Sequence, residues 1–395
     1  MNPSDFLVAA HALLPQVKAW REAIHADPEL SFQEERTKEK VLSYLPTGWE
    51  IQTWQSHHGL LVSKTGRPGS GRRVGIRAEL DALPIEEKTQ ASYASKHAGR
   101  MHACGHDVHT ACLLGAMHLL SNLKEEWQGD VLAVFQPAEE QLPGGGKMML
   151  EQGLFAEHRP DVLIGMHVFP EMQVGAVGFR PGPYMASTDE LWISVQGRGG
   201  HAALMRQNEN ALAAASALVS RVYALGETMS TPEEPIVASI GWFQGLGSTN
   251  VIPAQVELKG TLRCLTPERR NLAHQALQKL AVDLDVEFGT QTHIDIRSGY
   301  PPLVNSVEWT AWASSKAAEL LGPQNSRELP IRMTADDFAW YAPVAPLVYF
   351  RLGTASANGE HAFSVHDARF DIDPESLVVG TAMLAWLAYS ACRSV

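Results

Sequence analysis

Four short apolar runs rich in β-branched residues constrain the fold of this chain more than any other feature. Helix-like segments separate the runs, and a long apolar helix pattern follows the last of them at "PESLVVGTAMLAWLAYSAC" (374–392). Alternation of this kind is typical of a mostly parallel sheet with helices on both faces. The sequence therefore predicts an α/β domain with a helix at "HTACLLGAMHLLSNL" (109–123) and with strands at "RRVGIRAEL" (72–80), "GDVLAVFQ" (129–136), "DVLIGMHV" (161–168) and "PLVYFRLG" (346–353).

The pattern changes between residues 189 and 297. The order there is strand "DELWISVQG", helix "ENALAAASALVSRVYAL", strands "IVASIGWF" and "AQVELKGTLRCL", helix "PERRNLAHQALQKLAVDL" and strand "HIDIR". This βαββαβ order is that of a ferredoxin-like α+β unit. We predict that the unit is inserted through the proline-rich "FRPGPYM" (179–185), so that residues 1–181 and 299–395 form one discontinuous domain and residues 182–298 form the other.

Composition argues against several classes of function. The 395 residues are 45% hydrophobic, which is enough for two buried cores. The chain has 32 Lys and Arg against 44 Asp and Glu, which gives a net charge of -12, and it has no basic cluster. We therefore expect neither nucleic acid nor a membrane surface as a partner. Four scattered cysteines suit a reducing cytoplasm. The N-terminal segment resembles an amphipathic helix rather than a signal peptide. The sequence contains no run of about 18 apolar residues, so we expect no membrane span.

The segment "HACGHDVHT" (102–110) crowds histidine, cysteine and aspartate into one loop before a helix. Cys104 and His106 flank a glycine and offer a thiolate and an imidazole, which are ligands of a borderline cation such as zinc. The neighbouring His102 and His109 can equally cap the helix or pack beside it.

Further candidate ligands stand at the ends of predicted strands. Glu139 and Glu140 follow the strand at 129–136, His167 ends the strand at 161–168, and His366 comes after the last strand. Acid pairs usually lie on solvated faces, and a lone histidine is usually packed. The strand ends of a doubly wound sheet, however, converge on the edge where such sheets bind ligands. Neighbouring carboxylates at that edge can divide their roles, one binding metal and the other accepting a proton.

Nine stretches, in order and over nearly the whole chain, resemble the amidohydrolase branch of the aminoacylase and carboxypeptidase-G-like metallopeptidase family. That branch includes hippurate hydrolases, auxin-conjugate hydrolases and N-acetyl-diaminopimelate deacetylases. The stretches are "IHADPELSFQE" (24–34), "RAELDALPI" (77–85), "MHACGHDVHTACLLGAM" (101–117), "FQPAEE" (135–140), "GMHV" (165–168), "GRGGHAA" (197–203), "NVIPAQVELKGTLR" (250–263), "TADDFAWY" (334–341) and "VHDARFDID" (365–373).

The resemblance implies two divalent metal ions per subunit. It implies Glu139 as the general base and Asp81 as the carboxylate that orients a metal ligand. Zinc is expected from the cysteine and histidine ligands, while manganese, nickel and cobalt are the alternatives. The implied ligands are Cys104, shared between the ions, with His106, Glu140, His167 and His366.

The inserted domain is implied to act as a lid and to join two subunits. The resemblance places His201 at the scissile carbonyl, often from the partner subunit of a homodimer, as a donor to the developing oxyanion. It places Asn250 and Arg263 facing the substrate. The guanidinium of Arg263 suits a free carboxylate, although a strand arginine is often only an ion-pair partner.

The implied function is cleavage of the amide bond of N-acyl amino acids or similar small amides by a metal-activated water, in the cytoplasm. The alternative is a dipeptidase or carboxypeptidase with the same dinuclear site. A catalytically inactive binding module would be expected to lack Glu139 or a ligand, and a redox role for Cys104 lacks a second cysteine at C-x-x-C spacing. The chain departs from the family's common residues at four positions, which leaves substrate size and lid contacts open: Glu79, Leu204, Met205 and Asp336.

Overall fold

The computed structural model of the chain describes residues 2–67, 69–123, 127–204, 209–359 and 361–393. Contacts divide the chain into two compact units. The first unit consists of Met1–Gly182, Asn305–Pro330 and Trp340–Val395, and the second consists of Pro183–Val304 and Ile331–Ala339.

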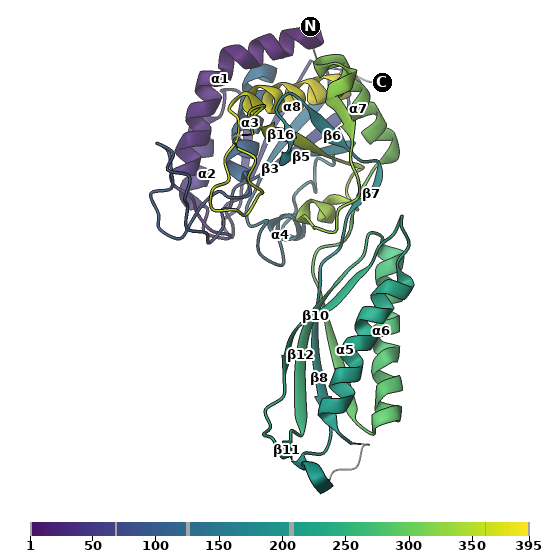
Figure 1. The fold of residues 1–395 in the computed structure, drawn as a ribbon. Helices are drawn as coiled ribbons and strands as arrows, with labels where there is room; N and C mark the ends of the chain where they lie inside the picture. The colour runs from purple at the N-terminus through teal and green to yellow at the C-terminus, as the bar shows by residue number, and fades with distance from the viewer. Residues whose placement is uncertain (1, 68, 124–126, 205–208, 360, 394–395) are drawn as a thin grey trace. The chain divides into compact units, whose positions relative to one another are not determined.

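The first unit is built around an eight-stranded sheet in the order β1-β2-β4-β3-β5-β16-β6-β15 (Figure 1). Its four central strands run parallel to one another, and residues on both faces of β3, β4 and β16 are buried. Such burial is expected of parallel strands, and it confirms the predicted α/β fold. The strands are β1 (Glu50–Thr53), β2 (Leu60–Thr65), β3 (Arg73–Glu79), β4 (Asp130–Gln136), β5 (Val162–Gln173), β6 (Val177–Phe179), β15 (Ser326–Glu328) and β16 (Leu347–Ala355).

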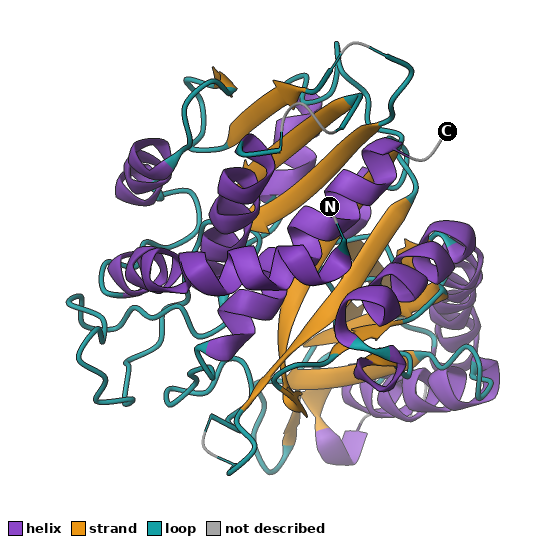
Figure 2. Ribbon diagram, turned by 90° about the horizontal axis from the view of Figure 1, so that it is seen from above, coloured by secondary structure: helices purple, strands orange, loops and turns teal. Residues whose placement is uncertain are grey.

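Three helices pack on one another and lie over this sheet (Figure 2): α1 (Pro3–His25), α3 (His106–Ser121) and α8 (Glu375–Arg393). By length and composition α8 could cross a membrane, but 89% of its most apolar window is buried inside the protein. Because it is enclosed by other elements, α8 can be apolar on all sides as a core helix. The remaining helices of the unit are α2 (Glu35–Tyr44), α4 (Gly145–Glu151) and α7 (Val307–Leu321).

A glycine sets the start of α3. The helix begins at His106, three residues before the predicted start, because Gly105 adopts φ +81° at the N-cap. A Cβ at this position would lie 2.6 Å from Val168 Cγ2, so the turn also approaches β5 closely. The tight turn places Cys104 just before the helix and His106 at its first position.

The second unit has the predicted βαββαβ order. Its antiparallel sheet runs β10-β12-β8-β13, the order of a ferredoxin-like unit, and α5 and α6 pack with it around a separate apolar core. The elements are β8 (Asp189–Gln196), α5 (Ala211–Met229), β10 (Val237–Gln244), β12 (Gln255–Arg263), α6 (Pro267–Phe288) and β13 (Gln291–Ser298), with a short ladder of β9 (Gly200–His201) and β11 (Val251–Ile252). A further short ladder pairs β7 (Gly182–Met185) with β14 (Leu303–Asn305).

The second unit includes residues 299–304 and 331–339, which the sequence assigned to the other domain. Thr188 N donates to Tyr300 O at 3.0 Å, Met185 forms a bridge with Arg332, and Ala186 N donates to Thr334 O at 2.9 Å. The predicted boundary was therefore wrong over these segments. Their pairing joins residues far apart in the chain, which a local sequence pattern does not reveal.

A buried ion pair ties α6 to the start of β8. Asp189 is 1% exposed and accepts hydrogen bonds from Arg270 Nε at 3.0 Å and from His274 Nε2 at 2.8 Å. Burial would raise the pKa of Asp189, but the hydrogen bonds from His274 and Arg270 outweigh it and lower the pKa. The pair therefore stabilises the fold above the ordinary Asp pKa near 4, and this contribution disappears as pH falls through the lowered value.

Replacing Asp189 with alanine should destabilise the second unit by about 3 kcal/mol, because the half-buried Arg270 and His274 would lose their buried anion. We expect roughly 100-fold faster hydrogen exchange of the amides of β8 and α6 at neutral pH. The matched control is Asp283→Ala, which removes the exposed pair with Lys279 (2.6 Å) and should cost no more than about 1 kcal/mol. Equal exchange rates in the two variants would contradict the role of Asp189.

Candidate metal centre

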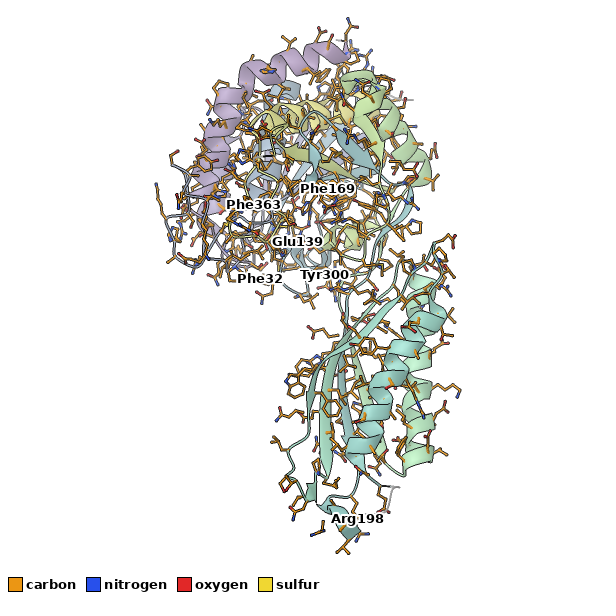
Figure 3. The ribbon with its side chains drawn as sticks, viewed as in Figure 1. Phe32, Glu139, Phe169, Arg198, Tyr300 and Phe363 are labelled. Carbon is orange, nitrogen blue, oxygen red and sulfur yellow. The ribbon has the colours of Figure 1, made fainter. Side chains whose placement is uncertain are left out.

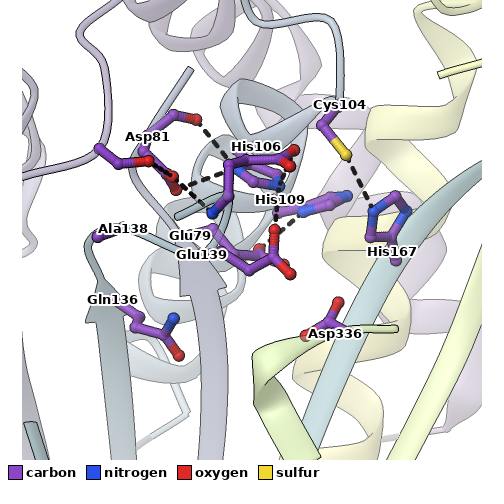
Figure 4. Close-up of polar contacts among 12 residues, drawn as sticks. Glu79, Asp81, Cys104, His106, His109, Gln136, Ala138, Glu139, His167 and Asp336 are labelled. Carbon is purple, nitrogen blue, oxygen red and sulfur yellow. Dashed lines mark hydrogen bonds and ion pairs between the residues drawn. The ribbon is translucent and has the colours of Figure 1, made fainter. Parts of the chain in front are cut away.

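Four segments of the first unit bring their polar side chains together beside the carboxyl end of β4 and the middle of β5. Figure 4 shows Cys104, His106, Glu139 and His167 among them. Gly105 and the start of α3 position Cys104 and His106, and the turn after β4 carries Glu139 and Glu140. His167 lies within β5, and the loop before α8 supplies His366, whose backbone N donates to Ala103 O at 2.7 Å. All five candidate ligands named from the sequence are therefore in one place.

Two overlapping ligand sets share Cys104. One comprises Cys104, His106 and His167, and the other comprises Cys104, Glu140 and His366, with all ligand atoms of each set within 4.8 Å of one another. Cys104 Sγ lies 3.4 Å from His167 Nε2 and 3.3 Å from His366 Nε2. His366 Nε2 is also 3.3 Å from Glu140 Oε1. The arrangement offers two adjacent positions with one sulfur common to both.

The two buried histidines present the same ring nitrogen to this centre. His167 Nδ1 is 2.8 Å from the carbonyl oxygen of Val168, and His106 Nδ1 is 2.9 Å from that of Asp81. A carbonyl only accepts, so both rings carry a hydrogen on Nδ1, and in the neutral ring Nε2 has the lone pair that can bind a metal ion. Among the described residues, His106 Nε2 and Glu140 Oε1 are buried without a hydrogen-bond partner. Backbone carbonyls that orient an imidazole in this way are typical of metal-binding histidines.

The charge of the centre also favours a cation. Burial would lower the pKa of His106, but the negative charges of Glu79, Asp81 and Glu140 outweigh it and raise the pKa to about 10. Burial and the carboxylates of Glu140 and Glu139 raise the pKa of the Cys104 thiol. The surroundings thus favour a proton on both side chains, because the buried negative charge of the centre calls for a compensating positive charge. Because a divalent cation would supply that charge and a thiolate with imidazoles and carboxylates suits zinc-like ions, the residues fit a metal.

Glu139 and Asp81 border the ligand sets. Glu139 is 7% exposed, and its Oε2 lies 3.9 Å from His106 Nε2 (Figure 3 shows its place in the first unit). Asp81 Oδ1 is 3.3 Å from His106 Nδ1, and Oδ2 accepts hydrogen bonds from Glu140 N at 3.0 Å and Ser31 Oγ at 2.7 Å. Burial would raise the pKa of Asp81, but its hydrogen bond with His106 and that residue's charge outweigh it and lower the pKa, so Asp81 is ionised.

His109 lies beside the centre but is committed to the fold. Val168 N donates to His109 Nε2 at 2.9 Å, and His109 Nδ1 lies 2.7 Å from Glu79 Oε2. Both ring nitrogens are thus occupied, although Glu79, His106 and His109 stand close enough together to suggest a further ligand set. The glutamate at 79, which also pairs with Arg77, holds His109 in this orientation. The departure at Glu79 therefore has a structural role in this chain.

The remaining site candidates lie in the second unit. His201 and Asn250 are exposed and adjacent, since His201 pairs with Val251 across β9 and β11, and Ala202 N donates to Asn250 O at 2.9 Å. Arg263 ends β12, whose nine residues span roughly 27 Å from Gln255. Gln255 pairs with Gln196 at the end of β8 that precedes His201, whereas Leu262 pairs with Asp189 at the other end. One copy of the chain therefore does not bring Asn250 and Arg263 together, contrary to the expectation that both face one substrate.

The other departures from the common residues have different surroundings. Leu204 is 83% exposed, Met205 lies outside the described residues, and Asp336 is buried, with its Oδ1 accepting a hydrogen bond from Phe338 N at 2.8 Å.

A buried polar network behind the Cys104 loop was not predicted. Arg21 Nε lies 2.7 Å and His25 Nδ1 lies 2.8 Å from Asp107 Oδ2, and the same arginine reaches Asp371 at 2.9 Å. Asp107 follows His106 in the first turn of α3, so the network anchors the segment that carries two ligands. The sequence signal that could have indicated this network is the pair Arg21 and His25, which are four residues apart and lie on the apolar, buried face of α1.

Comparisons with known proteins agree with this geometry. The family described as Peptidase family M20/M25/M40 matches residues 75–390. The chain is 34% identical over 379 residues to the N-acetylcysteine deacetylase of Bacillus subtilis, covering 95% of this chain and 96% of the relative. It is 34% identical over 358 residues to the N-acetyldiaminopimelate deacetylase of Priestia megaterium, covering 89% and 94%.

A solved structure gives the same result. A Bacillus subtilis protein described as a dinuclear metal-binding peptidase of the M20 family superimposes with a TM-score of 0.84 at 30% identity, covering 98% of this chain and 99% of the other. The resemblance in sequence motifs, the family match and these whole-length relatives agree with one another, and the chain belongs to peptidase family M20/M25/M40.

Proposed function

We propose that this chain is a metal-dependent amidohydrolase that releases the acyl group from N-acyl amino acids or similar small amides. The observation that carries the proposal is the convergence of five ligand-type side chains, one of them the thiol shared by both sets, with a further buried carboxylate, Glu139, at their edge. The relatives named as deacetylases of N-acetylated amino acids support the substrate class.

Two divalent ions would be held by the sets that share Cys104, one with His106 and His167 and the other with Glu140 and His366. Ions bound there would lower the pKa of a water molecule and polarise the carbonyl of the amide. Thiolate and imidazole ligands favour zinc, and manganese, nickel and cobalt are the alternatives to test.

Glu139 carries the proton transfers in this proposal. A carboxylate at its position would accept a proton from the attacking water and deliver it to the leaving nitrogen, which must be protonated before the C–N bond breaks. Asp81 keeps the imidazole of His106 oriented through its carbonyl oxygen and its carboxylate.

Substrate contacts from the second unit require two copies of the chain. Because Asn250 and Arg263 stand a strand length apart in one copy, they could meet at one carboxylate only if they came from different subunits. We propose a homodimer joined through the second unit, in which His201 of the partner subunit donates a hydrogen bond to the developing oxyanion. The edge strand β10, with Trp242 and Phe243 exposed along it, supports this role. The four free cysteines are consistent with our proposal of a cytoplasmic location.

Metal content tests the shared sulfur. Wild-type protein should hold about two ions per subunit by elemental mass spectrometry, and Cys104→Ala should lose both because both sets need its thiolate. His366→Ala should keep about one ion. The control Cys112→Ala removes a buried thiol two turns along α3 and should keep both. Full metal content in Cys104→Ala would contradict the assignment.

Glu139→Gln should lower kcat on an N-acetyl amino acid by about 10²-fold to 10⁴-fold, because an amide cannot accept the proton of water. Metal content and thermal stability should stay unchanged. A panel of acetyl, benzoyl and longer acyl amino acids, with dipeptides added, then separates a deacylase from a dipeptidase. A variant that keeps more than about a tenth of wild-type kcat would show that Glu139 is not the base.

Mixed dimers test the contribution of the partner subunit. Glu139→Gln and His201→Ala homodimers should both be inactive, the latter by about 10²-fold to 10³-fold as an oxyanion donor is lost. If His201 acts across the dimer, a heterodimer of the two variants regains one complete site, so an equal mixture refolded together should recover about a quarter of wild-type activity. Activity no higher than that of the parents, or an active monomer in sedimentation, would contradict the proposal.

A further inference from the structure

The turn that carries Glu139 has an unusual backbone. Ala138, the residue before Glu139, adopts φ +51° and is fully buried. A residue with a Cβ disfavours positive φ, so this conformation persists only where neighbouring groups hold it. The question is which groups hold Ala138 and therefore set the direction of Glu139.

Both polar groups of the Ala138 backbone are engaged. Its C=O accepts a hydrogen bond from Gly145 N at 2.8 Å, and its N–H donates to Glu34 Oε1 at 2.8 Å. A Cβ at Gly145 would lie 1.7 Å from Pro137 O, so the loop after the turn closes against the chain before it. One side of the turn is therefore fixed by local chain closure, and the other by a side chain that is 104 residues away in sequence.

Glu34 is itself rigidly held. It is fully buried, and the same Oε1 accepts a second hydrogen bond from Phe32 N at 2.8 Å. Ser31, three residues earlier, donates to Asp81 Oδ2 at 2.7 Å, and that oxygen also accepts from Glu140 N at 3.0 Å. The segment from Ser31 to Glu34 thus holds the peptide between Pro137 and Ala138 directly through Glu34, and the peptide between Glu139 and Glu140 indirectly through Asp81.

The structure assigns to Glu34 the role of a positioning residue that holds the strained backbone at Ala138 and thereby directs the Glu139 carboxylate into the centre. This inference rests on the proposed function of Glu139. It depends on the length and accepting oxygen of the Glu34 side chain and not on its charge. Burial and the charge of Asp81 raise the pKa of Glu34 to about 8, which agrees with a role for a neutral acid.

Two substitutions separate length from charge. Glu34→Gln keeps an accepting oxygen at the same place, so kcat should stay within about threefold of wild type. Glu34→Asp keeps a carboxylate but shortens the side chain by one methylene, so its oxygen no longer reaches Ala138 N. A catalytic group displaced by about 1 Å can cost about 10²-fold, and we expect kcat of Glu34→Asp to fall by that order with KM little changed.

A third substitution tests the link to the backbone. Glycine adopts positive φ without the steric cost that alanine meets, so Ala138→Gly added to Glu34→Asp should restore kcat by about tenfold. Metal content, measured on every variant, should match that of the wild type, because Glu34 contacts none of the proposed ligands. Thermal unfolding checks that each variant is folded. A crystal structure of Glu34→Asp should show Ala138 at negative φ.

Equal kcat values for Glu34→Gln and Glu34→Asp would overturn the inference, as would a lack of recovery in the double variant. A fall in metal content that accounts for the lost activity would also overturn it, because Glu34 would then act on the metal centre and not on Glu139. These outcomes are distinct from failure of the proposed function, which would appear as activity in Glu139→Gln.

Discussion

Negative charge buried at the carboxyl ends of the central strands is the constraint on which the first unit depends. Glu79 and Asp81 are almost fully enclosed, and Glu139 and Glu140 lie directly beside them. An unpaired carboxylate in such surroundings costs several kcal/mol, so each of these groups needs a compensating partner. Arg77 and His109 compensate Glu79, and His106 with Ser31 and a backbone N–H compensates Asp81. The charge that remains on the Glu140 side is what the proposed metal ions would neutralise.

The compensating partners also determine which atoms face the centre. Because the Nδ1 atoms of His106 and His167 are tied to backbone carbonyls, their Nε2 atoms are the only ring nitrogens left to bind a ligand. His109 differs from them because both of its ring nitrogens are engaged, Nε2 by Val168 N and Nδ1 by Glu79. It is therefore excluded as a metal ligand although it lies beside the centre. Backbone strain occurs in the same region, since Ala138 and His366 both have positive φ. Such strain persists where surrounding contacts determine the conformation, which is common at functional sites.

The second unit places its candidate residues by strand register. His201 and Asn250 share one short ladder, while Arg263 lies at the opposite end of β12. The motif "NVIPAQVELKGTLR" contains both Asn250 and Arg263, yet an extended strand separates them more widely than most segments of that length. Asn250 and Arg263 are thus close in sequence but about one strand length apart in space. This separation is the physical reason for proposing that two subunits contribute to one site.

The sequence by itself determined the classes of element and the chemistry of the centre. Periodicity located the four central strands, the ferredoxin-like unit and the long buried helix α8, because alternation and apolar runs are local properties. The rule that parallel strands end at one edge, together with the family resemblance, predicted that Cys104, Glu140, His167 and His366 converge, although β5 continues to Gln173 beyond His167. The resemblance implied His106 as a ligand, and only the tertiary structure showed why His106 and not His109 faces the centre. His106 Nδ1 donates to Asp81 O and leaves Nε2 available, whereas Glu79 and Val168 N engage both ring nitrogens of His109. The tertiary structure also decided the boundary of the second unit and the contacts of Glu34 and Arg21, because these join residues that are distant along the chain and leave no periodic pattern in it.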